Sequence, residues 1–230
     1  MKAIVLAGGL GTRLARVTRD IPKPMAPIGS RPFLAYLLDC LLEQGIEEIV
    51  LAVSYKWQVI QQCFGSEYRG IPLVYSVEDK PLGTGGAIRQ ALQSITDDEA
   101  VVLNGDTLFC VDLKDMEANH MRCGTQLSIA LKQVVDSGRF GHVEVSANGV
   151  ITSFREKSTA VGGWINGGVY MLNRKLFADM PMPEKFSFEQ DLVEPNIARI
   201  QPQAFLSDAY FIDMGIPEDY VRAQHEIGVE

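Results

Sequence analysis

The chain has 230 residues, is 47% hydrophobic and 22% charged, and its 21 Lys plus Arg against 29 Asp plus Glu give a formal net charge of −8. This composition excludes a disordered chain and a disulfide-stapled mini-protein. The acid excess argues against nucleic acid or an anionic membrane surface as a partner. No apolar run approaches the roughly 20 residues of a membrane span, and the N-terminal run is too short for a signal peptide. We therefore expect a cytoplasmic protein.

Short apolar runs alternate with helical patterns in the first half of the chain. Strands are predicted at Lys2–Leu6, Ile49–Val53, Ile71–Val77 and Ala100–Leu103, and helices at Phe33–Leu42, Trp57–Phe64 and Ala87–Ile95. Ser30 and Pro32 are expected to begin the first helix. Because the strands are continuously apolar, the pattern favours a mostly parallel sheet covered by helices on both faces.

The regular alternation of predicted strands and helices ends after Asp106. Extended segments are predicted at Leu127–Val134, His142–Val145, Val150–Phe154, Ile165–Leu172 and Ala204–Ile212, and helices at Lys114–Arg122, Ser187–Arg199 and Pro217–Ile227. Asn148-Gly149 is typical of a hairpin turn. We predict one α/β domain over residues 1–230, with a Rossmann-like, mostly parallel mixed sheet and a small mixed α/β extension.

A glycine-rich segment follows the first predicted strand. It reads Gly8-Gly9-Leu10-Gly11-Thr12-Arg13-Leu14, and Pro22-Lys23-Pro24 comes after seven further residues. Such a loop lies at the carboxyl edge of an α/β sheet, where ligands bind. Glycines let backbone N–H groups approach phosphate oxygens, and Arg13 and Lys23 would add positive charge. The segment is not a Walker loop and lacks the third glycine of a dinucleotide fingerprint. The plain alternative is a glycine turn with exposed basic residues.

This signature resembles that of the sugar-1-phosphate nucleotidyltransferases, GGxGTRL followed by a spaced PKP. The resemblance implies a nucleotidyltransferase, GT-A-like core with a nucleotide-binding half at 1–113 and a sugar-phosphate-binding half at 114–230. It also implies that the nucleoside and triphosphate are held by Leu6, Ala7, Gly8, Gly9, Gly11, Thr12, Arg13 and Lys23.

A second glycine loop joins a predicted strand to a helix. It runs from Glu78 to Ala87 and contains Gly83 and Thr84, which the resemblance assigns to nucleotide binding. Glu78 stands at the family's base-reading position. Its carboxylate only accepts hydrogen bonds, while guanine offers adjacent N1–H and N2–H₂ donors, so Glu78 is a candidate guanine reader. The alternative is an exposed acidic residue in an ordinary turn.

Two aspartates follow strands near the predicted phosphates. Asp106 ends the Asn104-Gly105-Asp106 segment, and Asp213 ends Phe211-Ile212-Asp213. Mg²⁺ is held by one or two carboxylates together with phosphates. Each aspartate alone could be a turn acid, but the pair matches the family's metal ligands, so Mg²⁺ is the expected cofactor.

A third group of residues resembles the family's sugar site. The resemblance assigns sugar contacts to Asn104, Gly141, Glu156, Asn166 and Gly168, and the incoming phosphate to Lys157. Without it, Glu156-Lys157 would be interpreted as a solvated pair after a hairpin.

The resulting hypothesis is an enzyme that makes an NDP-sugar and pyrophosphate from an NTP and a sugar 1-phosphate, with Arg13, Lys23 and Lys157 as catalytic residues. Residues 22–27, 31–34 and 81–88 most resemble D-glycero-α-D-manno-heptose 1-phosphate guanylyltransferases, so GTP and that sugar phosphate are favoured. Alternatives are a mannose 1-phosphate guanylyltransferase, a uridylyl- or thymidylyltransferase, and a non-catalytic nucleotide-sugar sensor. Homo-oligomerisation stays open.

Overall fold

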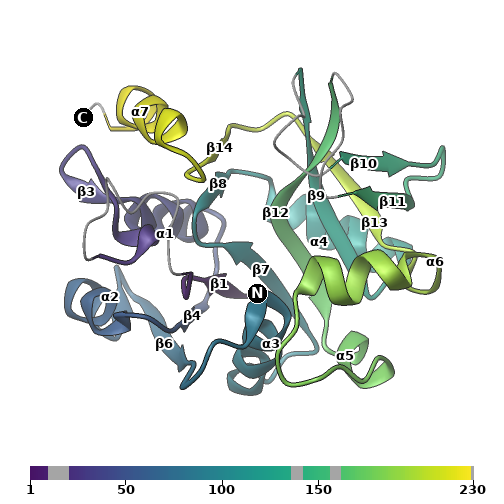
Figure 1. Cartoon of the computed structure of the whole chain (residues 1–230), viewed down its shortest axis with the longest axis horizontal. Coiled ribbons are helices and arrows are strands. Elements are labelled where there is room, and N and C mark those ends of the chain that lie inside the picture. Colours follow the sequence, from purple (N-terminus) through teal and green to yellow (C-terminus); the bar gives the residue numbers. More distant parts are fainter. Residues whose placement is uncertain (10–20, 136–141, 156–161, 229–230) are drawn as a thin grey trace.

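The computed structural model describes residues 1–9, 21–135, 142–155 and 162–228 (Figure 1). Four parallel strands form the centre of its main sheet: β6 (Ile71–Val77), β4 (Glu48–Val53), β1 (Lys2–Leu6) and β7 (Glu99–Asn104). Their side chains alternate between two buried layers, because Ala3 and Val5 face one core cluster and Ile4 faces the other. This explains why these strands are apolar at nearly every position.

The long strand β12 (Gly163–Asn173) extends the sheet with antiparallel pairing. It pairs with β7 on one side, and along its length with β9 (Leu127–Val134) and β10 (His142–Val145). The sheet continues through β11 (Ile151–Arg155), while β13 (Gln203–Ser207) pairs parallel with β9. The predicted fold class, a mixed sheet flanked by helices, is confirmed.

Helices cover both faces of the sheet. On one side α1 (Phe33–Glu43), α2 (Trp57–Phe64), α4 (Leu113–Cys123) and α7 (Pro217–Glu226) contribute to one core cluster. On the other side α3 (Gly83–Ala91), α5 (Lys175–Asp179) and α6 (Ile197–Ile200) contribute to the second. In the part of the chain that is described, none of these helices has both the length and the apolar character to cross a membrane.

Two small antiparallel strand pairs complete the fold. One is the hairpin of β2 (Pro27–Ile28) with β3 (Arg31–Pro32), and the other is a two-stranded sheet in which β8 (Thr107–Phe109) pairs antiparallel with β14 (Phe211–Asp213), from a distant part of the chain. In Figure 1 the chain runs from the purple N-terminal part across to the green part that contains β12, and then returns. The yellow helix α7 therefore lies beside β3. Gln224 of α7 accepts from Gly29 N–H at 2.9 Å and donates to the Pro27 carbonyl at 2.6 Å.

The structure corrects three predicted elements. The helix expected to begin at Ala87 begins at Gly83, inside the glycine loop. The single helix expected over 187–199 is divided into three parts: a π-helix at Phe188–Val193, a 3₁₀ turn at Glu194–Asn196 and then α6. A continuous α-helix is interrupted here because Pro195 lacks a backbone N–H. The strand expected over 204–212 is divided between β13 and β14. Ser30 makes no cap, since α1 begins directly after Pro32.

A buried histidine joins α4 to the sheet. His120 is 1% exposed, and its ring nitrogens contact Ser128 Oγ at 2.8 Å and Glu99 Oε2 at 3.1 Å. Because a carboxylate only accepts, the neutral ring donates from Nε2 to Glu99 and accepts at Nδ1 from Ser128. Burial lowers the pKa of His120, and this effect outweighs the opposing attraction of Glu99 and Glu117.

This lowered pKa predicts an acid-sensitive contribution to stability. The unfolded chain takes up a proton near pH 6.5, while the folded chain resists it, so stability is lost as pH falls from 6.5 through the folded-state pKa. We expect the free energy of unfolding, measured by urea titration between pH 8 and 5, to fall less steeply in His120→Gln than in the unmodified protein. Parallel curves for the two proteins would contradict this assignment.

Candidate active site

The candidate site lies where the parallel strands end. Strand β1 pairs Leu6 with Ala52 of β4 and with Asn104 of β7, and β4 pairs Val53 with Val77 of β6. The loops that follow these strands therefore meet at one edge, as is general for ligand sites in open α/β sheets.

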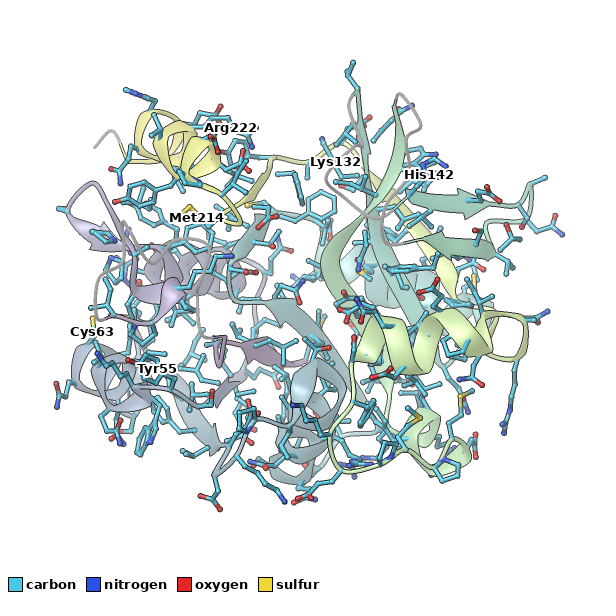
Figure 2. The ribbon with its side chains drawn as sticks, in the orientation of Figure 1. Tyr55, Cys63, Lys132, His142, Met214 and Arg222 are labelled. Carbon is cyan, nitrogen blue, oxygen red and sulfur yellow. The ribbon has the colours of Figure 1, made fainter. Side chains whose placement is uncertain are left out.

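A cavity of about 660 Å³ opens at this edge. Its walls come from the loops after β1, β4, β6 and β7, from the start of α3, and from the turn that contains Lys23. The residues lining it are Leu6, Gly8, Gly9, Lys23, Pro24, Ala52, Ser54, Tyr55, Glu78, Asp79, Lys80, Pro81, Gly83, Thr84, Ala87, Asn104, Asp106 and Glu189. Tyr55 lies just before α2, away from the β12 side of the molecule (Figure 2).

Glu78 is held in the wall of this cavity. Its Oε2 accepts from Leu82 N–H at 2.9 Å, and burial raises the pKa of the carboxyl group although this hydrogen bond opposes the rise. A Cβ on Gly8 would lie 2.8 Å from Glu78 Oε1. The absence of a side chain at position 8 therefore lets the carboxylate lie directly against the loop after β1, where Ser54 Oγ donates to the Gly8 carbonyl at 2.6 Å.

The loop that enters α3 is shaped by contact with residues 184–188. Gly85 N–H donates to the Phe186 carbonyl at 3.0 Å, and Phe186 N–H donates to the Leu82 carbonyl at 3.0 Å. Gly83 has φ +72°, and a Cβ there would lie 2.5 Å from the Phe186 carbonyl oxygen. Glycine at position 83 is thus required by packing within the chain, which the sequence pattern alone did not indicate.

A smaller cavity of about 190 Å³ adjoins the first. It is lined by Lys23, Asn104, Asp106, Thr107, Asn166, Gly168, Phe211, Asp213 and Gly215. Lys23, Asn104 and Asp106 line both cavities. A substrate that fills the larger cavity and a second substrate in the smaller one would therefore meet at Lys23 and Asp106.

Two aspartates are brought together in the smaller cavity. Met214 N–H donates to the Asp106 carbonyl at 2.8 Å, and Asp213 pairs with Thr107 in the antiparallel β8–β14 pair. Met214 is fully buried and lies between α7 and the α1 side of the molecule (Figure 2), which anchors the segment. Lys23 Nζ forms an ion pair with Asp106 Oδ2, so this carboxylate already faces a positive charge.

Asn166 reaches the smaller cavity through an irregularity in β12. The pairing of β12 with β9 shifts register between Asn166 and Tyr170, and Gly168 has φ +71°. Gly168 N–H donates to Asn166 Oδ1 at 3.0 Å, which fixes the side chain at the bulge. Such bulges commonly redirect a side chain toward a site.

The structure brings together most of the predicted site residues that it describes. The cavities are lined by Leu6, Gly8, Gly9, Lys23, Glu78, Gly83, Thr84, Asn104, Asp106, Asn166, Gly168 and Asp213. Ala7 is 2% exposed and lines neither cavity. Gly11, Thr12, Arg13, Gly141, Glu156 and Lys157 lie outside the described residues.

Several residues that line the cavities were not predicted as site residues from the sequence, among them Ser54, Tyr55 and Glu189. Ser54 and Tyr55 follow β4 at the same edge as the other loops, and this position is the signal that could have indicated them. Glu189 lies in a segment with a helical pattern. No local signal indicates its place in the cavity, because long-range packing brings the segment onto α3.

Comparison with known proteins identifies relatives over nearly the whole chain. Residues 2–229 match the family described as nucleotidyl transferase. The chain is 46% identical to a D-glycero-alpha-D-manno-heptose 1-phosphate guanylyltransferase of Aneurinibacillus thermoaerophilus, covering 99% of this chain and 98% of the relative. It is 48% identical to the enzyme of that name from Campylobacter jejuni, covering 96% and 97%.

A solved structure shares the fold. The crystal structure of HddC from Yersinia pseudotuberculosis complexed with GMP-PN superposes with a TM-score of 0.87 at 38% identity, covering 98% of each chain. The matched sequence, the shared fold and the near-complete coverage agree. The chain belongs to the nucleotidyl transferase family.

Proposed function

We propose that this chain transfers a guanylyl group from GTP to D-glycero-α-D-manno-heptose 1-phosphate, giving the GDP-sugar and pyrophosphate. The observation that carries the proposal is the pair of adjoining cavities that share Lys23, Asn104 and Asp106. The two heptose 1-phosphate guanylyltransferases at 46% and 48% identity support the choice of sugar. Since the donor is a nucleoside triphosphate, we expect the reaction to take place in the cytoplasm.

The proposed chemistry needs positioning and charge more than a general base. An oxygen of the sugar phosphate attacks the α-phosphorus of the NTP and forms a new P–O bond. The bond from the α-phosphorus to the bridging oxygen breaks, and pyrophosphate leaves with the electron pair. The attacking phosphate is already an anion, so the protein contributes alignment and stabilisation of the developing charge. Lys23, at the junction of the cavities, is suited to this role.

We propose Mg²⁺ as the cofactor, held by Asp106 and Asp213. The donor set fits, because carboxylate oxygens are hard ligands and the ion pair with Lys23 puts a cation against Asp106. Among the described residues, no group of three or more His, Cys, Asp or Glu side chains could hold a metal, so phosphate oxygens would complete the coordination. When bound, Mg²⁺ would supply Lewis-acid stabilisation of phosphate charge.

We propose that Glu78 reads the base. Its carboxylate lies in the larger cavity beside Gly8 and offers only acceptors, which complement the N1–H and N2–H₂ donors of guanine. Burial of this carboxylate strengthens the discrimination, since an unpaired buried acceptor costs free energy.

The proposal is tested by pyrophosphate release with Mg²⁺. GTP, ATP, UTP and dTTP are each combined with D-glycero-α-D-manno-heptose, mannose and glucose 1-phosphates. We expect the highest kcat/KM for GTP with the heptose phosphate, and loss of turnover with EDTA that excess Mg²⁺ restores. The best rate with mannose 1-phosphate would support the rival guanylyltransferase, and no turnover with any pair would support a sensor.

Replacing Lys23 is predicted to reduce turnover sharply. In Lys23→Ala the charge at the junction of the two cavities is lost, and we expect kcat/KM to fall on the order of 10²–10³-fold, as for removal of a charge-stabilising group. Lys114→Ala removes an exposed lysine of α4 and is the matched control, with unchanged turnover. Near-normal kcat/KM in Lys23→Ala would refute the role of this lysine.

Replacing Glu78 is predicted to change the base preference. An amide offers one acceptor and one donor, which suits the N3–H and O4 of uracil or thymine better than the guanine edge. In Glu78→Gln we expect the ratio of kcat/KM for GTP to that for dTTP to fall on the order of 10–100-fold. Glu67→Gln on β5 (Glu67–Tyr68) is the exposed control. An unchanged ratio would mean that the base is read elsewhere.

A further inference from the structure

A buried tyrosine lies directly behind both cavities. Tyr170 is fully buried in β12, where its hydroxyl group accepts from Asn166 Nδ2 at 2.7 Å and donates to Glu189 Oε1 at 2.8 Å. The side chain of Asn104 also interacts with this phenol. Tyr170 lines neither cavity, while Asn104 and Asn166 line the smaller one.

The hydrogen bonds of Tyr170 continue through Glu189 to the loop that enters α3. Glu189 Oε2 accepts from Thr84 Oγ1 at 3.0 Å and from Ser187 Oγ at 3.3 Å. Phe188 N–H donates to Thr84 Oγ1 at 2.8 Å, which orients the threonine hydroxyl toward Glu189. Glu189 and Thr84 line the larger cavity, so a continuous chain of hydrogen bonds joins the two cavities through the interior.

The charge of Glu189 sets the direction of these hydrogen bonds. A carboxylate only accepts, so the single proton of the Tyr170 hydroxyl must point to Glu189 and its lone pairs must face the two asparagines. Burial raises the pKa of Tyr170 well above its ordinary value, so the phenol keeps this proton. Asn166 must then present its NH₂ group to Tyr170 and its carbonyl oxygen to Gly168 N–H, as observed.

This direction decides what Asn166 offers to a ligand. One N–H of its amide is used by Tyr170, and one lone pair of its carbonyl oxygen is used by Gly168. One N–H donor and one lone pair remain for the smaller cavity, each in a fixed place. If the amide could rotate by 180°, the donor and the acceptor would exchange places, and a substrate hydroxyl group would meet the wrong partner.

We propose that Tyr170 and Glu189 are positioning residues that fix the amide orientation of Asn166 for the sugar 1-phosphate. This inference rests on the proposed function. The two residues act through Asn166, and the chain of hydrogen bonds behind the cavities is the physical connection.

The first test is Tyr170→Phe, which removes only the hydroxyl group. We expect the KM for the sugar 1-phosphate to rise about tenfold, as for loss of one buried hydrogen bond, while the KM for the NTP stays within about twofold because Asn166, the amide that Tyr170 orients, lines only the smaller cavity. Tyr75→Phe is the matched control, since the Tyr75 hydroxyl bonds to the Gly65 carbonyl outside the site. Equal increases in both KM values would indicate a merely structural role and overturn the proposal.

The second test reverses the direction of the hydrogen bonds. Asn166→Asp introduces a second carboxylate that competes with Glu189 for the single Tyr170 proton. In the double variant Asn166→Asp/Glu189→Gln, the new amide can donate to Tyr170, which can then donate to the new carboxylate. We expect the double variant to have a lower KM for the sugar 1-phosphate than Asn166→Asp alone, by about threefold or more. A double variant with the product of the two single effects would overturn the proposal.

Thermal unfolding of the same proteins gives a readout independent of turnover. We expect the loss of Tm in the double variant to be smaller than the sum of the two single losses, because reversal restores a buried hydrogen bond. If the unmodified protein turned over no NTP and sugar-phosphate pair, the proposed function would fail while the Tm cycle still decided the direction of the hydrogen bonds. Additive Tm losses would count against the inference alone.

Discussion

The turn at Gly105 is the constraint on which the site depends. Gly105 N–H donates to the Leu6 carbonyl at 3.0 Å, and a Cβ on Gly105 would lie only 2.6 Å from that oxygen. Because no larger residue fits, the end of β7 can lie directly against the end of β1. Asp106 is thereby placed beside the glycine loop after β1, and its carbonyl oxygen accepts from Met214 N–H, next to Asp213. One close backbone contact thus helps to bring Asp106 and Asp213, the predicted metal ligands, to the end of β1.

The fold was predictable where the pattern is local. The run from Lys2 to Leu6 is buried on both faces, so continuous apolarity predicted β1 with its observed bounds. The pairings of β12 were not predictable, because contact with β7, β9 and β10 is decided by packing between distant segments. The segment after Ala204 was predicted as a single strand, since the local pattern does not indicate where β13 leaves β9 and β14 joins β8.

The site was predictable to the extent that its chemistry is carried by motifs. Glu78, Lys23 and Asp106 follow strands or glycine loops, and the structure places all three in one cavity, although their roles remain predictions. Gly83 shows the limit of a motif, because its conformation is required by the Phe186 carbonyl as well as by any ligand. Glu189 was missed since it approaches the site through tertiary contacts with Thr84 and Tyr170.

The hydrogen bonds between α7 and the β2–β3 hairpin have a consequence for the order in which the chain folds. Gln224 and Tyr220 hold the backbone around Pro27, just after the turn that carries Lys23, across a sequence separation of more than 190 residues. Contacts between such distant segments form late, since a long loop must close first. During synthesis on the ribosome, the contacts of α7 with the segment after the lysine turn can therefore form only once α7 has emerged.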